Sequence, residues 1–137
     1  MIRILIDPMG DGHSDLWLKV DAFPTFSQIA DSYYLGTDPE ISSVSEKAKN
    51  LISSWIEKIA ELDLNQSILL AFDISDEYVS GFRMTFGRKG IFVKYLTCRD
   101  SRFDSSSDFT SDPDQNWLLD KTAMLENLTW SLSRLKH

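Results

Sequence analysis

The sequence predicts an α+β domain in which an antiparallel sheet of about five strands packs with three helices. Two short alternating segments open the chain, a long amphipathic segment follows, and three strand-like segments then come in succession. Strands that occur in two groups separated by helices are typical of α+β rather than alternating α/β proteins. The expected order is strand, strand, helix, helix, strand, strand, strand, helix. With 137 residues, one domain spanning residues 1–137 is expected.

The first two elements are predicted to form a hairpin. Apolar residues alternate over residues 2–6 and again over residues 16–20. The residues between these segments are rich in Asp, Gly and Pro, which favour turns. We therefore expect two antiparallel strands.

A short helix is predicted next, over residues 26–34. Thr25 and Gln28 match a capping box, apolar residues follow at helical spacing, and Gly36 provides a C-terminal stop. A longer helix is predicted over residues 44–59, where the apolar residues keep helical spacing for about four turns.

Three sequential antiparallel strands are predicted after the long helix. The continuous apolar run at residues 68–72 indicates a central strand that is buried on both faces. Residues 80–86 and 91–95 alternate, and the segment 87–90 between them begins and ends with glycine, which predicts a hairpin.

The last part of the chain is predicted to be a long connection and a helix. Residues 99–116 are polar and include six serines or threonines, so an irregular loop is expected. Asp112 followed by Pro113 matches an N-cap before a proline in the first helical position. The final helix is therefore expected to begin there.

The charge of the chain is unevenly distributed around a net value of −7. Residues 1–40 hold seven acids and two bases, residues 81–99 hold five bases and no acid, and residues 100–116 hold five acids and one base. This balance disfavours nucleic acid as a partner, because phosphate binding needs Lys and Arg. A negative protein is steered towards cationic partners, although net charge also serves solubility alone.

A cytoplasmic protein without membrane contact is expected. The single cysteine, Cys98, cannot form an internal disulfide, which suits a reducing compartment, and its expected role is that of a small hydrophobic residue. The first residues are too short and too soon acidic for a signal peptide, and no apolar run approaches the length of a membrane span.

One loop contains residues that are able to ligate a metal. It spans residues 7–15 and contains Asp7, Asp11, His13 and Asp15. The spacing does not match an EF-hand, and turn chemistry explains every residue except His13. We therefore expect no metal and no cofactor, and a small metal-dependent hydrolase built on this loop stays an alternative.

A second polar feature is a basic hairpin at residues 87–90, flanked by Arg83, Lys94 and Arg99. It lacks the spacing of a phosphate-binding loop and precedes a strand rather than a helix. These cations are expected to be solvated strand residues that face acidic loops of the same protein.

Two of the four tryptophans are expected in the core, and two are candidates for an interface. Trp55 and Trp117 fall on apolar stripes, whereas Trp17 and Trp130 do not. An exposed tryptophan beside acidic loops is a candidate anchor for a partner.

The candidate binding face is acidic. Asp73, Asp76 and Glu77 follow the strand at residues 68–72, and loops at strand ends often carry function. They are interpreted as partner-binding residues or as turn residues. A catalytic pair of the glycoside-hydrolase type is less favoured, because the sequence gives no separation between the carboxylates.

The chain has an acidic stretch from Asp73 to Glu77 and then a basic stretch from Gly81 to Arg83. In these stretches, and in its size, charge and α+β layout, it resembles small acidic immunity proteins of bacterial polymorphic toxin systems, including contact-dependent growth inhibition. The resemblance implies a non-enzymatic inhibitor that binds one cognate toxin domain, such as a basic nuclease, and blocks its active site. A regulatory adaptor whose loop at residues 99–116 orders on binding is a further alternative. The expected contact residues are Asp73, Asp76, Glu77, Asp100, Asp104, Asp108 and Trp17.

Overall fold

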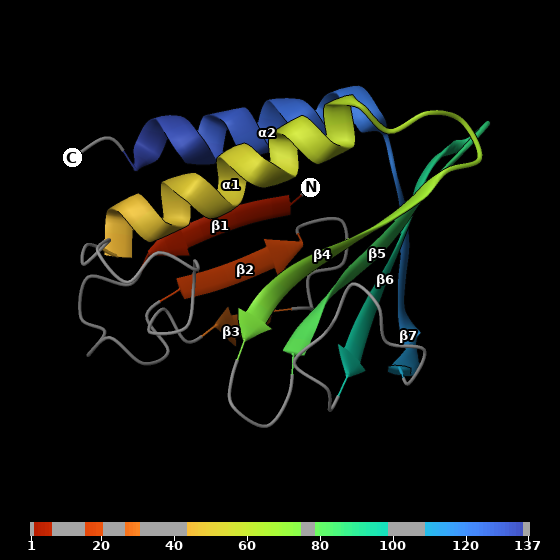
Figure 1. Cartoon of the computed structure of the whole chain (residues 1–137), viewed down its shortest axis with the longest axis horizontal. Helices are drawn as coiled ribbons and strands as arrows, with labels where there is room; N and C mark the ends of the chain where they lie inside the picture. Colours follow the sequence, from red (N-terminus) through yellow and green to blue (C-terminus); the bar gives the residue numbers. More distant parts are fainter. Residues whose placement is uncertain are drawn as a thin grey trace.

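The structure is a computed structural model that describes residues 2–6, 16–20, 27–30, 44–74, 79–98 and 109–135. Within these ranges it describes the side chains of residues 3–5, 46–72, 79–98 and 116–135. The described residues form two antiparallel sheets and two helices, so the predicted α+β class is confirmed. The predicted single sheet of about five strands with three helices is wrong, because the described strands form one sheet of three strands and one of four. Figure 1 shows the two helices side by side, both on one side of the strands.

The first sheet has three strands, β1 (Ile2–Ile6), β2 (Leu16–Val20) and β3 (Ser27–Ala30), in that order. The predicted hairpin of the first two strands is confirmed, with Ile4 opposite Leu18. The prediction of a helix over residues 26–34 is wrong at β3, which pairs with β2. Strand pairing with β2 overrides the local helical spacing here, because propensity is weaker than tertiary contact.

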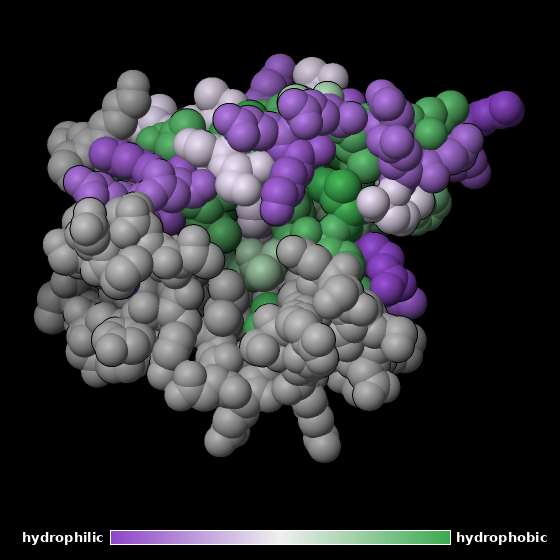
Figure 2. All heavy atoms as spheres, viewed as in Figure 1, coloured by the Kyte–Doolittle hydropathy of each residue, from purple (hydrophilic) through white to green (hydrophobic). Residues whose placement is uncertain are grey.

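Helix α1 (Val44–Ala60) confirms the predicted long helix. Its buried positions recur every three or four residues, about one helical turn, so they form one face directed at the strands. These positions are Ala48, Ile52, Trp55 and Ile59. Figure 2 shows hydrophilic residues over much of the helix layer and hydrophobic residues directly below it in this view.

The second sheet has four strands in sequence order: β4 (Ser67–Ile74), β5 (Val79–Gly87), β6 (Gly90–Cys98) and β7 (Phe109–Leu119). The predicted hairpin between β5 and β6 is confirmed, with Gly87 opposite Gly90. The prediction that residues 68–72 form a central strand is wrong. Among the described strands, β4 stands at one end of the sheet, with Leu70 and Phe72 buried and Leu69 half-buried.

Strand β7 overturns two predictions, the irregular connection to residue 116 and the helix that begins at Asp112. In the register of β6 with β7, Lys94 faces Asn116 and Leu96 faces Ser111. Four residues of β7, numbers 112–115, therefore lie opposite one residue of β6. Among the described strands β7 stands at the other end of the sheet, and an irregular end strand of this kind accommodates Pro113, which has no N–H for a sheet ladder.

Helix α2 (Lys121–Arg134) begins after β7. Its N-cap is Asp120, whose side chain accepts a hydrogen bond of 3.0 Å from the Ala123 backbone N–H. The Lys121 ammonium donates to the carbonyls of Ala60, at 3.3 Å, and Leu62, at 3.0 Å. Because Ala60 ends α1, these bonds fasten the beginning of α2 to the end of α1.

Aromatic rings form the centre of the core between the helices and the second sheet. The Trp55 ring lies 6.1 Å from Phe72 and 5.8 Å from Phe82, and Phe82 lies 5.2 Å from Tyr95, measured between ring centroids. These are tilted or edge-to-face contacts, the geometry that aromatic pairs prefer. Trp55 and Trp117 are both buried, as predicted, although Trp117 comes from a strand and not from a helix.

Candidate functional site

The candidate site lies on the face of the second sheet that points away from the helices. Side chains alternate between the two faces of a strand. In β5, Phe82 and Met84 point into the core, which directs Arg83 to the other face, called the outer face below. In β6, Val93 is buried in the core and Phe92 is exposed on the outer face.

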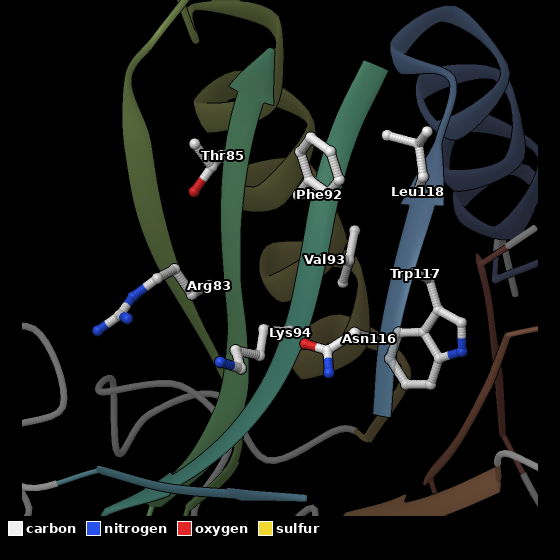
Figure 3. A pocket seen from close by; sticks show the side chains of 8 residues that line it. All are labelled: Arg83, Thr85, Phe92, Val93, Lys94, Asn116, Trp117 and Leu118. Carbon is white, nitrogen blue, oxygen red and sulfur yellow. The ribbon is translucent and has the colours of Figure 1, made fainter. Parts of the chain in front are cut away.

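The strand register aligns the outer residues in two rows across β5, β6 and β7 (Figure 3). These two rows form the wall of a hollow of about 420 Å³, called the outer groove below. The first row consists of Thr85, Phe92 and Leu118, and the second row consists of Arg83, Lys94 and Asn116.

The first row brings two large apolar side chains together at the surface. Phe92 is 53% exposed and Leu118 is 44% exposed, and they face each other across β6 and β7. Residues directly opposite in an antiparallel pair have Cβ atoms about 4.5–5.5 Å apart, so the two side chains make one continuous patch. Single exposed apolar residues are ordinary, and two that adjoin in one row are a candidate anchor for a partner.

The second row places two cations next to this patch. Arg83 and Lys94 are both half-buried and face each other across β5 and β6. Figure 3 shows Lys94 between Arg83 and Asn116. Among the described residues that line the outer groove, none is acidic. The groove therefore combines an apolar surface with positive charge.

Hydroxyl groups continue the first row towards β4. The Ser67 and Thr85 hydroxyls lie 2.7 Å apart in a hydrogen bond across β4 and β5. This bond links one side of the groove to β4, the end strand of the described sheet, which keeps the groove on regular, paired strands.

At the other end of the outer face the apolar side chains are buried. Val79, Leu96 and Cys98 form a second buried apolar cluster there, with Leu69 and Ala71 packed against it. The expected role of Cys98 as a small buried hydrophobic residue is confirmed. The two ends of one face thus differ, and only the end near the hairpin of β5 and β6 exposes large apolar side chains among the described residues.

A separate aromatic surface lies where α2 contacts β1. Trp130 is 39% exposed, as its place off the apolar pattern predicted. The guanidinium of Arg3 lies 5.3 Å from the centroid of its ring and that of Arg134 lies 5.2 Å from it. The Trp130 ring therefore already makes cation–π contacts with two guanidinium groups of the same chain.

The predicted acidic residues are not assembled into a site by the described part of the structure. Asp73 lies in β4 opposite Ser80, and Trp17 lies in β2 opposite Leu5 and Ile29. The other predicted contact residues, Asp76, Glu77, Asp100, Asp104 and Asp108, lie outside the described residues. The same holds for the metal-binding alternative, which rests on Asp7, Asp11, His13 and Asp15.

Sequence reasoning noticed Arg83 and Lys94 but missed Phe92 and Leu118 as site residues. Leu118 was hidden because its segment was assigned to a helix. Phe92 did give a signal, since a strand with one buried face has no structural need for a large apolar residue at an outward position. That signal becomes specific only when the register shows that Leu118 is its neighbour.

The chain was compared with known protein families, proteins and structures. No protein-family model, no curated protein and no solved structure matches this chain. Within the described side chains, no three His, Cys, Asp or Glu residues come together as metal ligands. Neither described helix has the length and hydrophobicity needed to cross a membrane.

Proposed function

We propose that this chain is a protein-binding domain that neutralises a partner in the manner of an inhibitor or immunity protein, and that the partner docks on the outer groove. The observation that carries this proposal is the exposed pair of Phe92 and Leu118 on neighbouring paired strands. Large apolar residues in a contiguous exposed patch are the type of anchor around which interfaces form.

The energetics of the pair favour docking. Full burial of a Phe or Leu side chain is worth about 1.5–3 kcal/mol, so burying the half that is still exposed would contribute about 1 kcal/mol for each residue. Both residues lie on hydrogen-bonded strands, and a surface that is already ordered loses little conformational freedom on binding. The patch is therefore suited to act as the apolar centre of a larger interface.

The chemistry of the groove supports binding over catalysis. Its described outward residues provide guanidinium, ammonium, hydroxyl and carboxamide groups beside apolar ones. General acid–base catalysis uses His most often and also Asp, Glu, Lys, Tyr or Cys, and of these the described lining of this groove contains Lys94 alone. The groove is equipped to hold a partner in a fixed orientation.

The acidic residues stay part of the proposal as a second, electrostatic contact. If Asp76 and Glu77 attract a basic toxin domain, reversing both charges will slow association and weaken its dependence on salt. Stopped-flow association rates with the isolated partner, measured at low and high salt, would check this. Unchanged rates at both salt concentrations would remove these two residues from the interface.

The docking site is tested with a pair of matched variants. The first replaces both groove anchors, Phe92→Ser with Leu118→Ser, and the second is Leu64→Ser, which changes a 48% exposed leucine outside the groove. The native chain and both variants are used as affinity bait in lysate of the native host. We expect one stoichiometric partner to bind the native chain and the Leu64→Ser chain and to be lost with the groove variant. Equal capture by all three chains would contradict the proposal.

The neutralising role is tested with that captured partner. Expressed alone in growing cells, the partner should arrest growth, and the native chain should restore it. The groove variant should fail to restore growth, while Leu64→Ser should succeed. A partner without any effect on growth would contradict the inhibitor role.

A further inference from the structure

We infer that the occupant of the outer groove is an extended acidic segment of the partner, which places a carboxylate between Arg83 and Lys94 and an apolar side chain on Phe92 and Leu118. This inference rests on the proposed function, because it names the chemistry of the partner at the same groove. It is argued from the two opposed cations, the local reversal of charge along the chain and the spacing of the two rows.

The first argument is the like-charge pair. Arg83 and Lys94 stand directly opposite each other across β5 and β6. Like charges at directly opposed positions destabilise a strand pair. A carboxylate placed between the two cations would turn their repulsion into two attractions, and charge-assisted hydrogen bonds to a carboxylate are the stronger kind. The two cations are thus suited to hold a carboxylate of a ligand.

The second argument is the local reversal of charge. The chain as a whole has a net charge of −7, yet residues 81–99 contain five bases and no acid. The described residues that line the groove include two cations and no acid. Complementary potentials select partners and repel wrong ones, so this face selects an acidic surface.

The third argument is the spacing of the rows. Outward residues that are two apart along a strand lie about 7 Å from each other. Lys94 and Phe92 have this separation in β6, so the cationic row and the apolar row are about 7 Å apart. In an extended partner segment, side chains two residues apart also share one face. A segment with an acidic residue at one position and an apolar residue two positions away would match both rows.

The second row also offers a neutral hydrogen-bonding group. Asn116 stands next to Lys94 in the register and is exposed. Its carboxamide has both donors and an acceptor, so it is able to bond a carboxylate or a backbone group of the partner. The groove therefore favours a peptide segment over a simple apolar surface.

The inference is tested on the full-length chain labelled with ¹⁵N, with two short peptides as probes. The first is acetyl-Ser-Asp-Ser-Phe-Ser-amide, and the second has Lys in place of Asp. We expect the acidic peptide to shift the backbone amide signals of groove residues and to bind at least about tenfold more tightly than the basic one. Equal binding of both peptides, or shifts that lie outside the groove, would overturn the inference.

Matched charge variants identify the cation that is responsible. Lys94→Glu should weaken the acidic peptide by at least about tenfold, and the neutral Lys94→Gln should weaken it by less. Lys58→Glu makes the same change in net charge at an exposed position of α1, outside the groove, and should leave the affinity within about twofold. Equal effects of Lys94→Glu and Lys58→Glu would show a response to net charge only and overturn the site.

Two other occupants are distinguished in the same series. Inorganic phosphate that shifts the same amides at the same concentration as the acidic peptide would show a plain anion site and overturn a peptide site. A dimer of the chain in light scattering that Lys94→Glu dissociates would make a second copy the occupant. A monomer that responds to the acidic peptide alone supports the inference.

Failure of this inference differs from failure of the proposed function. If partner capture depends on Phe92 and Leu118 while the acidic peptide does not bind, the function stands and the acidic chemistry is wrong. If the acidic peptide binds through Lys94 while partner capture ignores the groove, the peptide chemistry stands and the proposed docking function is wrong.

Discussion

The two faces of the four-stranded sheet are built from the same strands and differ in what covers them. On the inner face, Phe82, Val93 and Trp117 pack under the helices and are at most 3% exposed. One residue away along the same strands, Phe92 and Leu118 are about half exposed. Residues that are adjacent in sequence are therefore either packed in the core or exposed on the outer face, depending on the direction of the side chain.

The comparison indicates that the outer groove contributes less to stability than the inner face does. An inward aromatic residue is held by contacts with several other buried residues, whereas outward Phe92 leaves half of its surface in water. Hydrophobic stabilisation follows the apolar area removed from water. Substitutions on the inner face should therefore change stability, and those on the groove should change binding.

The largest effect on stability is expected from two phenylalanines on opposite faces. Phe82→Ala removes a ring that contacts both Trp55 and Tyr95 and should lower the free energy of unfolding by about 3–5 kcal/mol. Phe92→Ala removes a half-exposed ring and should lower it by about 1 kcal/mol or less. Urea unfolding followed by tryptophan fluorescence would measure both. Similar losses for the two variants would break the comparison.

A second test concerns a glycine on the outer face. A Cβ at Gly81 would overlap the backbone carbonyl oxygen of Leu70 and lie 2.8 Å from the Cα of Ala71. Gly81→Ala should therefore cost about 1–3 kcal/mol of stability, because the backbone of β4 has to move. Gly87→Ala is the control, since its Cβ would meet only atoms at 3.6 Å or more. Denaturant midpoints that fall equally for both variants would argue against this close approach.

A third test uses serines of α2. Ser131 is buried, accepts a hydrogen bond of 3.3 Å from the Ile4 backbone N–H and donates one of 3.1 Å to the carbonyl of Asn127. Ser131→Ala leaves the Ile4 N–H without this acceptor and should cost about 1–3 kcal/mol. Ser133→Ala, at an exposed position, should cost about 0.5 kcal/mol or less. Thermal unfolding would rank the two, and the reverse order would contradict the packing of β1 against α2.

The smallest effect is expected at the like-charge pair. Lys94→Gln removes the repulsion with Arg83 and should raise the free energy of unfolding by about 0.2–1 kcal/mol at low salt. The gain should shrink at high salt, since ions screen partly exposed charges. Lys58→Gln serves as the control on α1. A clear loss of stability for Lys94→Gln would mean that Lys94 stabilises the fold. The proposed repulsion between Lys94 and Arg83 would then be wrong.

Much of the fold follows from local patterns. The long helix shows in the spacing of Ala48, Ile52 and Trp55, and the hairpin of β5 and β6 shows in strict alternation on both sides of a loop that begins and ends with glycine. Patterns of this kind are strong because one face of each element is buried against the rest of the protein.

The failures come from contacts that are distant in sequence. Ser27 to Ala30 have helical spacing but pair with β2, and Asp112 with Pro113 resembles a helix start but lies in an irregular edge strand. In both places the structure is determined by pairing with a neighbouring strand, and that strand lies outside the short stretch of sequence from which the prediction was made. The groove was missed for the same reason, because Phe92 and Leu118 become neighbours only through the register of β6 with β7.

The central claim is that the outer groove is where this protein meets its partner. The most direct measurement places a photo-reactive phenylalanine analogue at position 92, and in a separate chain at exposed position 64, and irradiates living host cells. The account predicts one covalent product with a single partner from position 92, which Lys94→Glu weakens, and no such product from position 64. The same product from both positions, or none from position 92, would contradict it.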